Sequence, residues 1–131
     1  MENKSVDELI IAIEIAAMEE WNRGNPSGFL DILADDITYF DPLTEKRFDG
    51  FDKMKDFYEG VRGKVSVDKY EIIDPVVQST SDMAVLTYNM NSFAGGISYK
   101  WNCTEVYKLA PGNKWKIIHN HWSLVRPLKA I

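Results

Sequence analysis

The chain has 131 residues, of which 45% are hydrophobic and 12% aromatic, and its formal net charge is −5. This composition is typical of a globular domain, and the length allows one domain with a sizeable core. We therefore expect a single domain over residues 1–131. The acidic balance argues against nucleic acid and against an anionic membrane surface as partners, because both are bound by clustered Lys and Arg.

Several features of the sequence suggest a cytoplasmic protein. Cys103 is the only cysteine, so an intramolecular disulfide is excluded. No apolar run approaches the roughly 20 residues that a membrane-spanning helix needs. The first residues, "MENKSVDE", are charged and unlike a secretory signal.

The first predicted element is an amphipathic helix. Ser5 and Glu8 form an S-x-x-E capping box, which is typical of a helix start. Gly24 ends this helix. The apolar residues between these points recur at helical spacing and form one stripe: Val6, Leu9, Ile10, Ile13, Ala17 and Trp21.

A shorter helix and a short strand are expected next. Asn25-Pro26 opens the second helix, because proline is tolerated in a first turn. Its apolar face is predicted to contain Phe29, Leu30, Ile32 and Leu33. The following "ITYF", residues 37–40, is β-branched and aromatic and predicts a strand that stops at Asp41-Pro42.

After Gly50, apolar residues at helical spacing predict a third helix that ends at Gly63. Strands are then expected at about 65–77, 83–93, 97–109 and 115–125, separated by "STSD", "AGG" and "APGN". Such short connections make neighbouring strands antiparallel. The order predicts an α+β fold, in which a curled antiparallel sheet wraps around the N-terminal helices and leaves a conical space.

The stretch "KWKIIHNHW" contains both histidines of the chain, His119 and His121. Residues two apart on a strand share a face, so the pair could reach one metal ion. Two imidazoles fall short of the three or four ligands of a zinc site, and we expect no metal and no cofactor. Hydrogen bonds on the sheet surface, a subunit contact and a direct role in the pocket all remain open for these side chains.

Two carboxylates are candidates for acid–base chemistry. Asp41 ends a strand where the chain must turn, and it could lean into the conical space as a general base, walled by Tyr39, Trp21 and Tyr58. The alternative is that an aspartate before proline is ordinary turn chemistry. Glu105 shares a strand face with Trp101 and Cys103, and it would be a pocket acid if that face pointed inward.

The run "LADDITYFDPLTEKRFDG" and the ending "WKIIHNHWS" resemble the nuclear transport factor 2-like superfamily, over nearly the whole chain. The SnoaL-like proteins and the association domain of calcium/calmodulin-dependent kinase II are the most similar branches. This resemblance implies a cone-shaped α+β fold with a deep pocket, and commonly a homodimer through the outer sheet face. As a guide to function it is weak, because one such fold hosts many chemistries.

Ketosteroid isomerase, in the same superfamily, has a similar A-D-D-A-T-V-E-D-P segment whose last aspartate shuttles a proton. Asp41 matches this base, and Glu105 falls near the protonated pocket aspartate of the isomerase. The oxyanion tyrosine of the isomerase is matched by Ala17, which makes steroid isomerisation itself doubtful. Another tyrosine, Asn89 or a histidine would have to supply a donor.

The kinase association domain carries arginines at positions that match Asn89, Glu105 and Trp122. Their absence argues against an acidic ligand bound in that manner, while the match suggests that the three positions face the pocket. If Trp122 faces inward, Ile118 and Asn120 do too, and both histidines point outward unless a β-bulge intervenes. The expected ligand-binding residues are Trp21, Tyr39, Tyr58, Asn89, Trp101, Asn120 and Trp122.

Three functions are consistent with these observations. The first is cofactor-free acid–base catalysis by Asp41 and Glu105 on a small, apolar, carbonyl-containing substrate. The second is binding of a small apolar or mixed-polarity ligand without chemistry. The third is a homodimeric association domain. The first predicts a raised pKa for Glu105.

Overall fold

A computed structural model describes residues 5–128 of the chain. Its first half contains two helices, two strands and a third helix, and a four-stranded meander forms the second half. The elements are α1 (Val6–Asn22), α2 (Ser27–Leu30), β1 (Leu33–Phe40), β2 (Phe48–Asp49), α3 (Phe51–Gly60), β3 (Lys69–Ser79), β4 (Met83–Ala94), β5 (Ile97–Ala110) and β6 (Lys114–Leu124).

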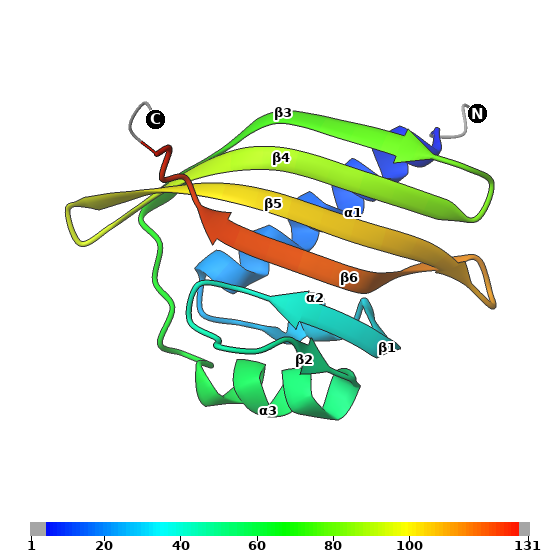
Figure 1. Ribbon diagram of the computed structural model, residues 1–131, viewed down its shortest axis with the longest axis horizontal. Coiled ribbons are helices and arrows are strands. Elements are labelled where there is room, and N and C mark those ends of the chain that lie inside the picture. Colours follow the sequence, from blue (N-terminus) through cyan, green and yellow to red (C-terminus); the bar gives the residue numbers. More distant parts are fainter. Residues whose placement is uncertain (1–4, 129–131) are drawn as a thin grey trace.

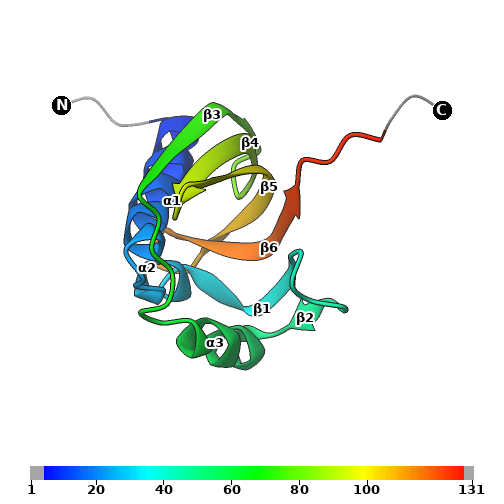
Figure 2. The same cartoon turned by 90° about the vertical axis from the view of Figure 1, so that its left-hand side faces the viewer.

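The six strands form one sheet in the order β2-β1-β6-β5-β4-β3. All neighbours are antiparallel except β1 and β6, which pair in parallel. The sheet curls, and α1 lies across its concave side while α3 lies below β1 (Figures 1 and 2). The predicted α+β fold of the nuclear transport factor 2-like type is confirmed.

The core lies between α1 and the concave face of the sheet. Ser5 caps α1 as expected, because its hydroxyl accepts the Glu8 backbone N–H at 3.2 Å. Along β4 every second residue is buried, which is the pattern of a strand with one face on the core. These inward side chains are Ala84, Leu86, Tyr88, Met90 and Ser92.

A β-bulge in β6 determines which of its side chains point inward. His119 pairs with Val106 while Ile117 pairs with Tyr107, so Ile118 is the extra residue. Ile117 is therefore buried in the core, and the expectation that Ile118 shares a face with Asn120 is wrong.

Two boundaries differ from the predicted ones for tertiary reasons. Ile32 and Leu33 were expected on the apolar face of the second helix, but α2 ends at Leu30 and Leu33 already begins β1. The Ile117 backbone N–H donates to the Ile32 carbonyl at 2.7 Å, so pairing with β6 captures these residues. β3 begins at Lys69, and the preceding segment runs past the end of α1, where the Val67 N–H donates to the Asn22 carbonyl at 3.0 Å.

None of the helices within residues 5–128 is both long and apolar enough to span a lipid bilayer.

Candidate functional site

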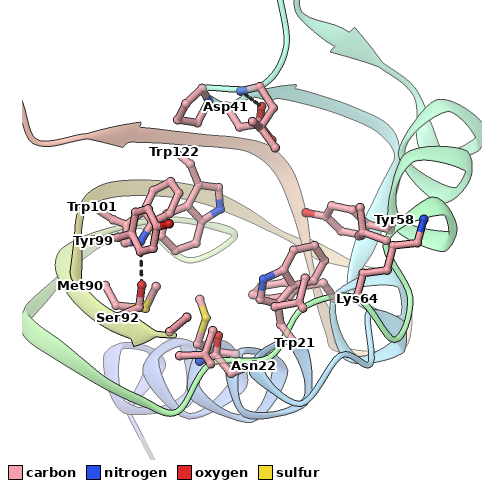
Figure 3. Close-up of a pocket in the computed structure, with 18 of the residues that line it drawn as sticks. Trp21, Asn22, Asp41, Tyr58, Lys64, Met90, Ser92, Tyr99, Trp101 and Trp122 are labelled. Atoms are coloured by element: carbon pink, nitrogen blue, oxygen red, sulfur yellow. Dashed lines mark hydrogen bonds between the residues drawn. The ribbon is translucent and has the colours of Figure 1, made fainter. Parts of the chain in front are cut away.

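A pocket of about 390 Å³ opens at one end of the space between the helices and the sheet (Figure 3). Its size falls within the range of small-molecule sites. It forms where the C-terminal part of α1 meets α3, the ends of β1 and β6, the inner face of β4 and β5, and the segment 64–67. Residues that line it include Met18, Trp21, Asn22, Phe29, Tyr39, Asp41, Leu43, Phe57, Tyr58, Lys64, Met90, Ser92, Tyr99, Trp101 and Trp122.

Aromatic rings make up much of the pocket wall. Trp21 on α1 packs against Tyr58 on α3, with ring centroids 4.8 Å apart. On the sheet side Trp101 and Trp122 meet edge to face at 5.8 Å. Such rings give a large apolar contact area with few rotatable bonds, which suits a flat or ring-shaped ligand.

Asp41 lies directly after β1 at the wall of this pocket and is half-buried. Its Oδ2 accepts the Tyr39 hydroxyl at 2.8 Å, and its Oδ1 accepts the Leu43 backbone N–H at 2.7 Å. The second contact is the turn chemistry expected of an aspartate before proline. The turn thus orients a carboxylate that also lines the pocket.

Burial raises the pKa of Tyr58 well above the usual value. Burial likewise raises the pKa of Tyr39, with smaller contributions from Tyr58 and Asp41. Both phenols therefore remain protonated donors at neutral pH. Figure 3 shows the Tyr58 side chain pointing into the pocket from α3.

Five of the expected ligand-binding residues line the pocket together with Asp41: Trp21, Tyr39, Tyr58, Trp101 and Trp122. Asn89 does not, and its placement toward the pocket was wrong. Its side chain is exposed on the outer face and donates to the Trp101 carbonyl at 3.0 Å and to Asn102 at 2.8 Å. The inward residues of β4 are the even-numbered ones, so an odd-numbered residue points outward.

Asn120 faces inward but lies deeper than the pocket, where it is 3% exposed. Its Nδ2 donates to the Thr104 carbonyl at 3.2 Å and contacts Cys103 Sγ at 3.7 Å. Its NH2 group is satisfied within the core, and Asn120 does not line the pocket as expected.

Glu105 also points inward, yet its carboxyl group is fully buried and does not line the pocket. It lies beside Glu14 of α1, and an oxygen of each carboxyl group is within 4.8 Å of the other and of Cys103 Sγ. Both Glu105 oxygens lack a hydrogen-bond partner among the described residues. Glu105 therefore lies in the closely packed interior and not at the open end of the cone.

The two carboxyl groups, Glu14 and Glu105, form a buried pair with unequal surroundings. Glu14 accepts the hydroxyls of Tyr88 at 2.6 Å and of Tyr107 at 2.5 Å. Burial, then the neighbouring Glu14, raises the pKa of Glu105 well above the usual value, as the sequence hypothesis predicted. The pKa of Glu14 is raised by burial too, against the lowering effect of its donors. We assign the proton to Glu105 and the acceptor role to Glu14, because both tyrosine donors point at Glu14.

This pair and Cys103 also offer three atoms of metal-ligating types. Both Glu14 oxygens, however, already accept tyrosine hydroxyls. Burial raises the pKa of the Cys103 thiol, which disfavours the thiolate that binds metal. Protonation of Glu105 and Cys103 and the two tyrosine hydrogen bonds explain the arrangement of this cluster, so no metal ion is needed to explain it.

Both histidines lie on the outer face of the sheet. The bulge at Ile118 precedes them, so it does not change the alternation between His119 and Trp122. His119 shares a hydrogen bond of 2.8 Å between its Nδ1 and the Thr38 hydroxyl. Its pKa is lowered by partial burial, and further by His121 and Arg47. The Phe40 ring lies 5.8 Å from the His119 ring and 5.1 Å from the His121 ring. The pair packs outside the cone and has no part in the pocket.

Three inward polar residues were missed: Glu14, Asn22 and Ser92. The first two follow the apolar stripe of α1, since Ile10, Glu14, Met18 and Asn22 are spaced by four. A polar residue on such a stripe is the signal that could have found them. Ser92 lies on the same face of β4 as Tyr88 and Met90, and the spacing of two along a strand could have placed it there.

The fold and the aromatic pocket define an α+β protein of the nuclear transport factor 2-like class. More narrowly, the chain belongs to the SnoaL-like domain family, whose profile matches residues 15–118. Among curated proteins, none matches the chain.

Solved structures of similar proteins cover almost the whole chain. A Parabacteroides distasonis protein provisionally named a ketosteroid isomerase is 39% identical, with a TM-score of 0.87 and 98% of each chain covered. A nuclear transport factor 2-like protein of unknown function from Pseudomonas putida is 21% identical, with a TM-score of 0.81 and 95% and 96% covered. The calcium/calmodulin-dependent kinase II hub of S. rosetta is 17% identical, with a TM-score of 0.76 and 95% and 100% covered. At their identities the last two show the fold alone.

Proposed function

We propose that the protein binds a small, largely apolar, carbonyl-containing molecule in the pocket and that Asp41 removes a proton from it without a cofactor. The observation that carries this proposal is the position of Asp41: a carboxylate on the wall of an aromatic pocket, oriented by Tyr39 and the Leu43 N–H. Orientation of a base before the substrate arrives is a large part of general-base catalysis. The similarity to the P. distasonis protein and its provisional name support the same reaction type.

In this mechanism an Asp41 oxygen takes a proton from the carbon beside the substrate carbonyl. Each carboxylate oxygen uses one lone pair in its present hydrogen bond and keeps another for this proton. The C–H electron pair moves onto the carbonyl oxygen and forms an enolate. Tyr58, a protonated phenol directed into the pocket, supplies a donor for that oxygen, a role that Ala17 cannot fill. Asp41 then returns its proton to the same or another carbon.

Glu105 has no part in this proposal, although the sequence suggested one. Its carboxyl group is fully buried beside Glu14 and does not line the pocket. A group that cannot touch the substrate is not a catalytic acid. We assign the Glu14–Glu105 pair to the core instead.

Deuterium exchange of 2-tetralone in D2O, followed by proton NMR, tests the proposal. The protein should accelerate exchange at the carbons beside the carbonyl over buffer, and Asp41→Asn should lower the protein-dependent rate by about 100-fold or more. Asp36→Asn is the matched control, because Asp36 is exposed on β1 outside the pocket. Full exchange activity in Asp41→Asn would remove Asp41 as the base. If the protein does not accelerate exchange over buffer and Asp41→Asn changes only the affinity for the ketone, the protein is a ligand-binding module.

We also propose a homodimer through the outer sheet face. Val76 on β3 and Phe40 on β1 are large apolar side chains that are 51% and 37% exposed on this face, and a second copy of the chain would cover them. Light scattering at micromolar concentration should give twice the chain mass of 15.0 kDa, and a monomer would contradict the proposal. The buried free thiol of Cys103 fits a reducing, cytoplasmic compartment.

A further inference from the structure

Two buried polar side chains line the pocket away from Asp41 without full hydrogen bonding. Asn22 at the end of α1 is 6% exposed, and Ser92 on β4 is 5% exposed. In Figure 3 both lie on the side of the pocket opposite to Asp41. Polar groups this deeply buried are nearly always paired, so an exception needs an explanation.

The Asn22 Nδ2 has no hydrogen-bond partner among the described residues. The α1 backbone at this residue is satisfied separately, since its carbonyl accepts the Val67 N–H at 3.0 Å. The side-chain amide is therefore not needed to end the helix. Rotation about the Cβ–Cγ bond has a broad energy profile, so the NH2 group can turn toward a bound molecule.

The Ser92 hydroxyl uses its oxygen as an acceptor and leaves its hydrogen available as a donor. Its Oγ accepts the Trp101 indole N–H at 3.1 Å, which fixes the hydroxyl in place. The hydroxyl hydrogen has no acceptor among residues 5–128. Asn22 and Ser92 thus both offer a donor, from the helix and from the sheet, at the same end of the pocket.

We propose that Asn22 and Ser92 form a polar anchor that binds an acceptor oxygen of the ligand, at the end of the molecule remote from Asp41. The ligand class follows: a ring-containing, mainly apolar molecule with a carbonyl or ether oxygen at its far end. The tryptophan walls hold the rings between the two ends. The anchor determines which ligand binds, whereas the proton transfer at Asp41 belongs to the function proposed above. This inference rests on that proposed function only in that both use the same pocket.

A pair of probes that differ in one oxygen tests the anchor: 4-phenylcyclohexanone and phenylcyclohexane. Their Kd values are measured by tryptophan fluorescence, because Trp21, Trp101 and Trp122 line the pocket. The quantity of interest is the ratio of the two Kd values in each variant relative to the ratio in the unaltered protein, because this comparison cancels the greater hydrophobicity of the hydrocarbon. Asn22→Leu should shift this ratio by about 3- to 10-fold against the ketone, and Ser92→Ala should shift it in the same direction by less.

Asn91→Leu is the matched control, since Asn91 lies on β4 with its side chain on the outer face, and its ratio should equal that of the unaltered protein. An unchanged ratio in both Asn22→Leu and Ser92→Ala would overturn the anchor, as would failure of the unaltered protein to bind either probe. The result is independent of catalysis. An unchanged ratio in Asn22→Leu and Ser92→Ala, together with deuterium exchange that depends on Asp41, removes only the anchor. A shifted ratio in these variants, together with full exchange in Asp41→Asn, removes only the catalytic proposal.

Discussion

The two halves of α1 pack against the same sheet but use buried polar side chains in opposite ways. Near the middle of the helix, Glu14 accepts two tyrosine hydroxyls and lies against a closely packed part of the sheet. Two turns later, Asn22 lines an open pocket with its Nδ2 unpartnered. The fold itself satisfies Glu14, whereas Asn22 carries an energetic cost until a ligand pairs with it.

The largest expected effect is at the satisfied half. Glu14→Ala should lower the free energy of unfolding by about 4 kcal/mol, because it leaves the hydroxyls of Tyr88 and Tyr107 unpaired and opens a cavity. Urea denaturation followed by circular dichroism measures this loss. Glu14→Gln, which keeps one acceptor oxygen, should lose less than half as much. A loss below about 1 kcal/mol for Glu14→Ala would show that the tyrosines find other partners.

The carboxyl pair also predicts how stability depends on pH. The pKa of Glu105 is raised above the ordinary glutamate value of 4.5 by burial and by Glu14. Above that value the unfolded chain releases a proton that the folded chain still holds, until the pH passes the folded-state pKa. The free energy of unfolding should therefore fall as the pH rises through this window, by up to about 1.4 kcal/mol per pH unit for one proton.

Glu105→Gln isolates this contribution, because glutamine has the same shape and no titrating proton. Urea denaturation of both proteins at pH 5, 6, 7 and 8 should show a flatter pH dependence for the variant and a growing advantage for it as the pH rises. Parallel curves would mean that Glu105 holds no extra proton in the folded state.

At the pocket half, the same kind of change should have the opposite sign. Asn22→Leu removes a buried donor that has no partner and should raise the free energy of unfolding by about 1 kcal/mol, seen as a higher Tm. Asn91→Leu on the outer face should change it by less than about 0.5 kcal/mol. A destabilised Asn22→Leu protein would indicate that Asn22 has a structural role, and the contrast between the two halves of α1 would disappear.

The last expected effect concerns the hydrogen bond that orients Ser92. A double-mutant cycle with Trp101→Phe and Ser92→Ala should give a coupling energy of about 1 kcal/mol, the usual net value of one such bond. Trp122→Phe in place of Trp101→Phe is the control, since Trp122 also lines the pocket and packs on Trp101. Equal coupling in both cycles would mean that ring packing, and not the indole N–H, holds the serine.

Much of this architecture was predictable from local patterns. The capping serine, the helical stripe of α1 and the turn sequences between the last strands located these elements to within a few residues, because each depends on side chains close in the chain. The aromatic wall of the pocket was anticipated for the same reason, together with the resemblance to the nuclear transport factor 2-like fold. Asp41 was found because a strand end before proline has a restricted geometry.

The predictions that failed concern which way a side chain points or how deep it lies. Asn89 on β4 faces the outer surface instead of the pocket, whereas Glu105 on β5 faces inward as expected but lies in the core and not at the pocket. The periodicity of a strand gives two faces without saying which is buried, and a resemblance aligned one residue out of place exchanges them. The parallel pairing of β1 with β6 likewise depends on residues about 80 positions apart.

The sequence by itself determined the elements, their order and the supply of aromatic and acidic side chains, since these follow from short-range periodicity and backbone preference. Only the tertiary structure decided that Glu105 meets Glu14 in the core, and that Asn22 and Ser92 line the same end of the pocket, Asn22 with an Nδ2 that has no partner among the described residues. The curl of the sheet brings these elements together, and the bulge at Ile118 decides which β6 side chains point inward. Both arise from contacts between distant strands, which no local pattern encodes.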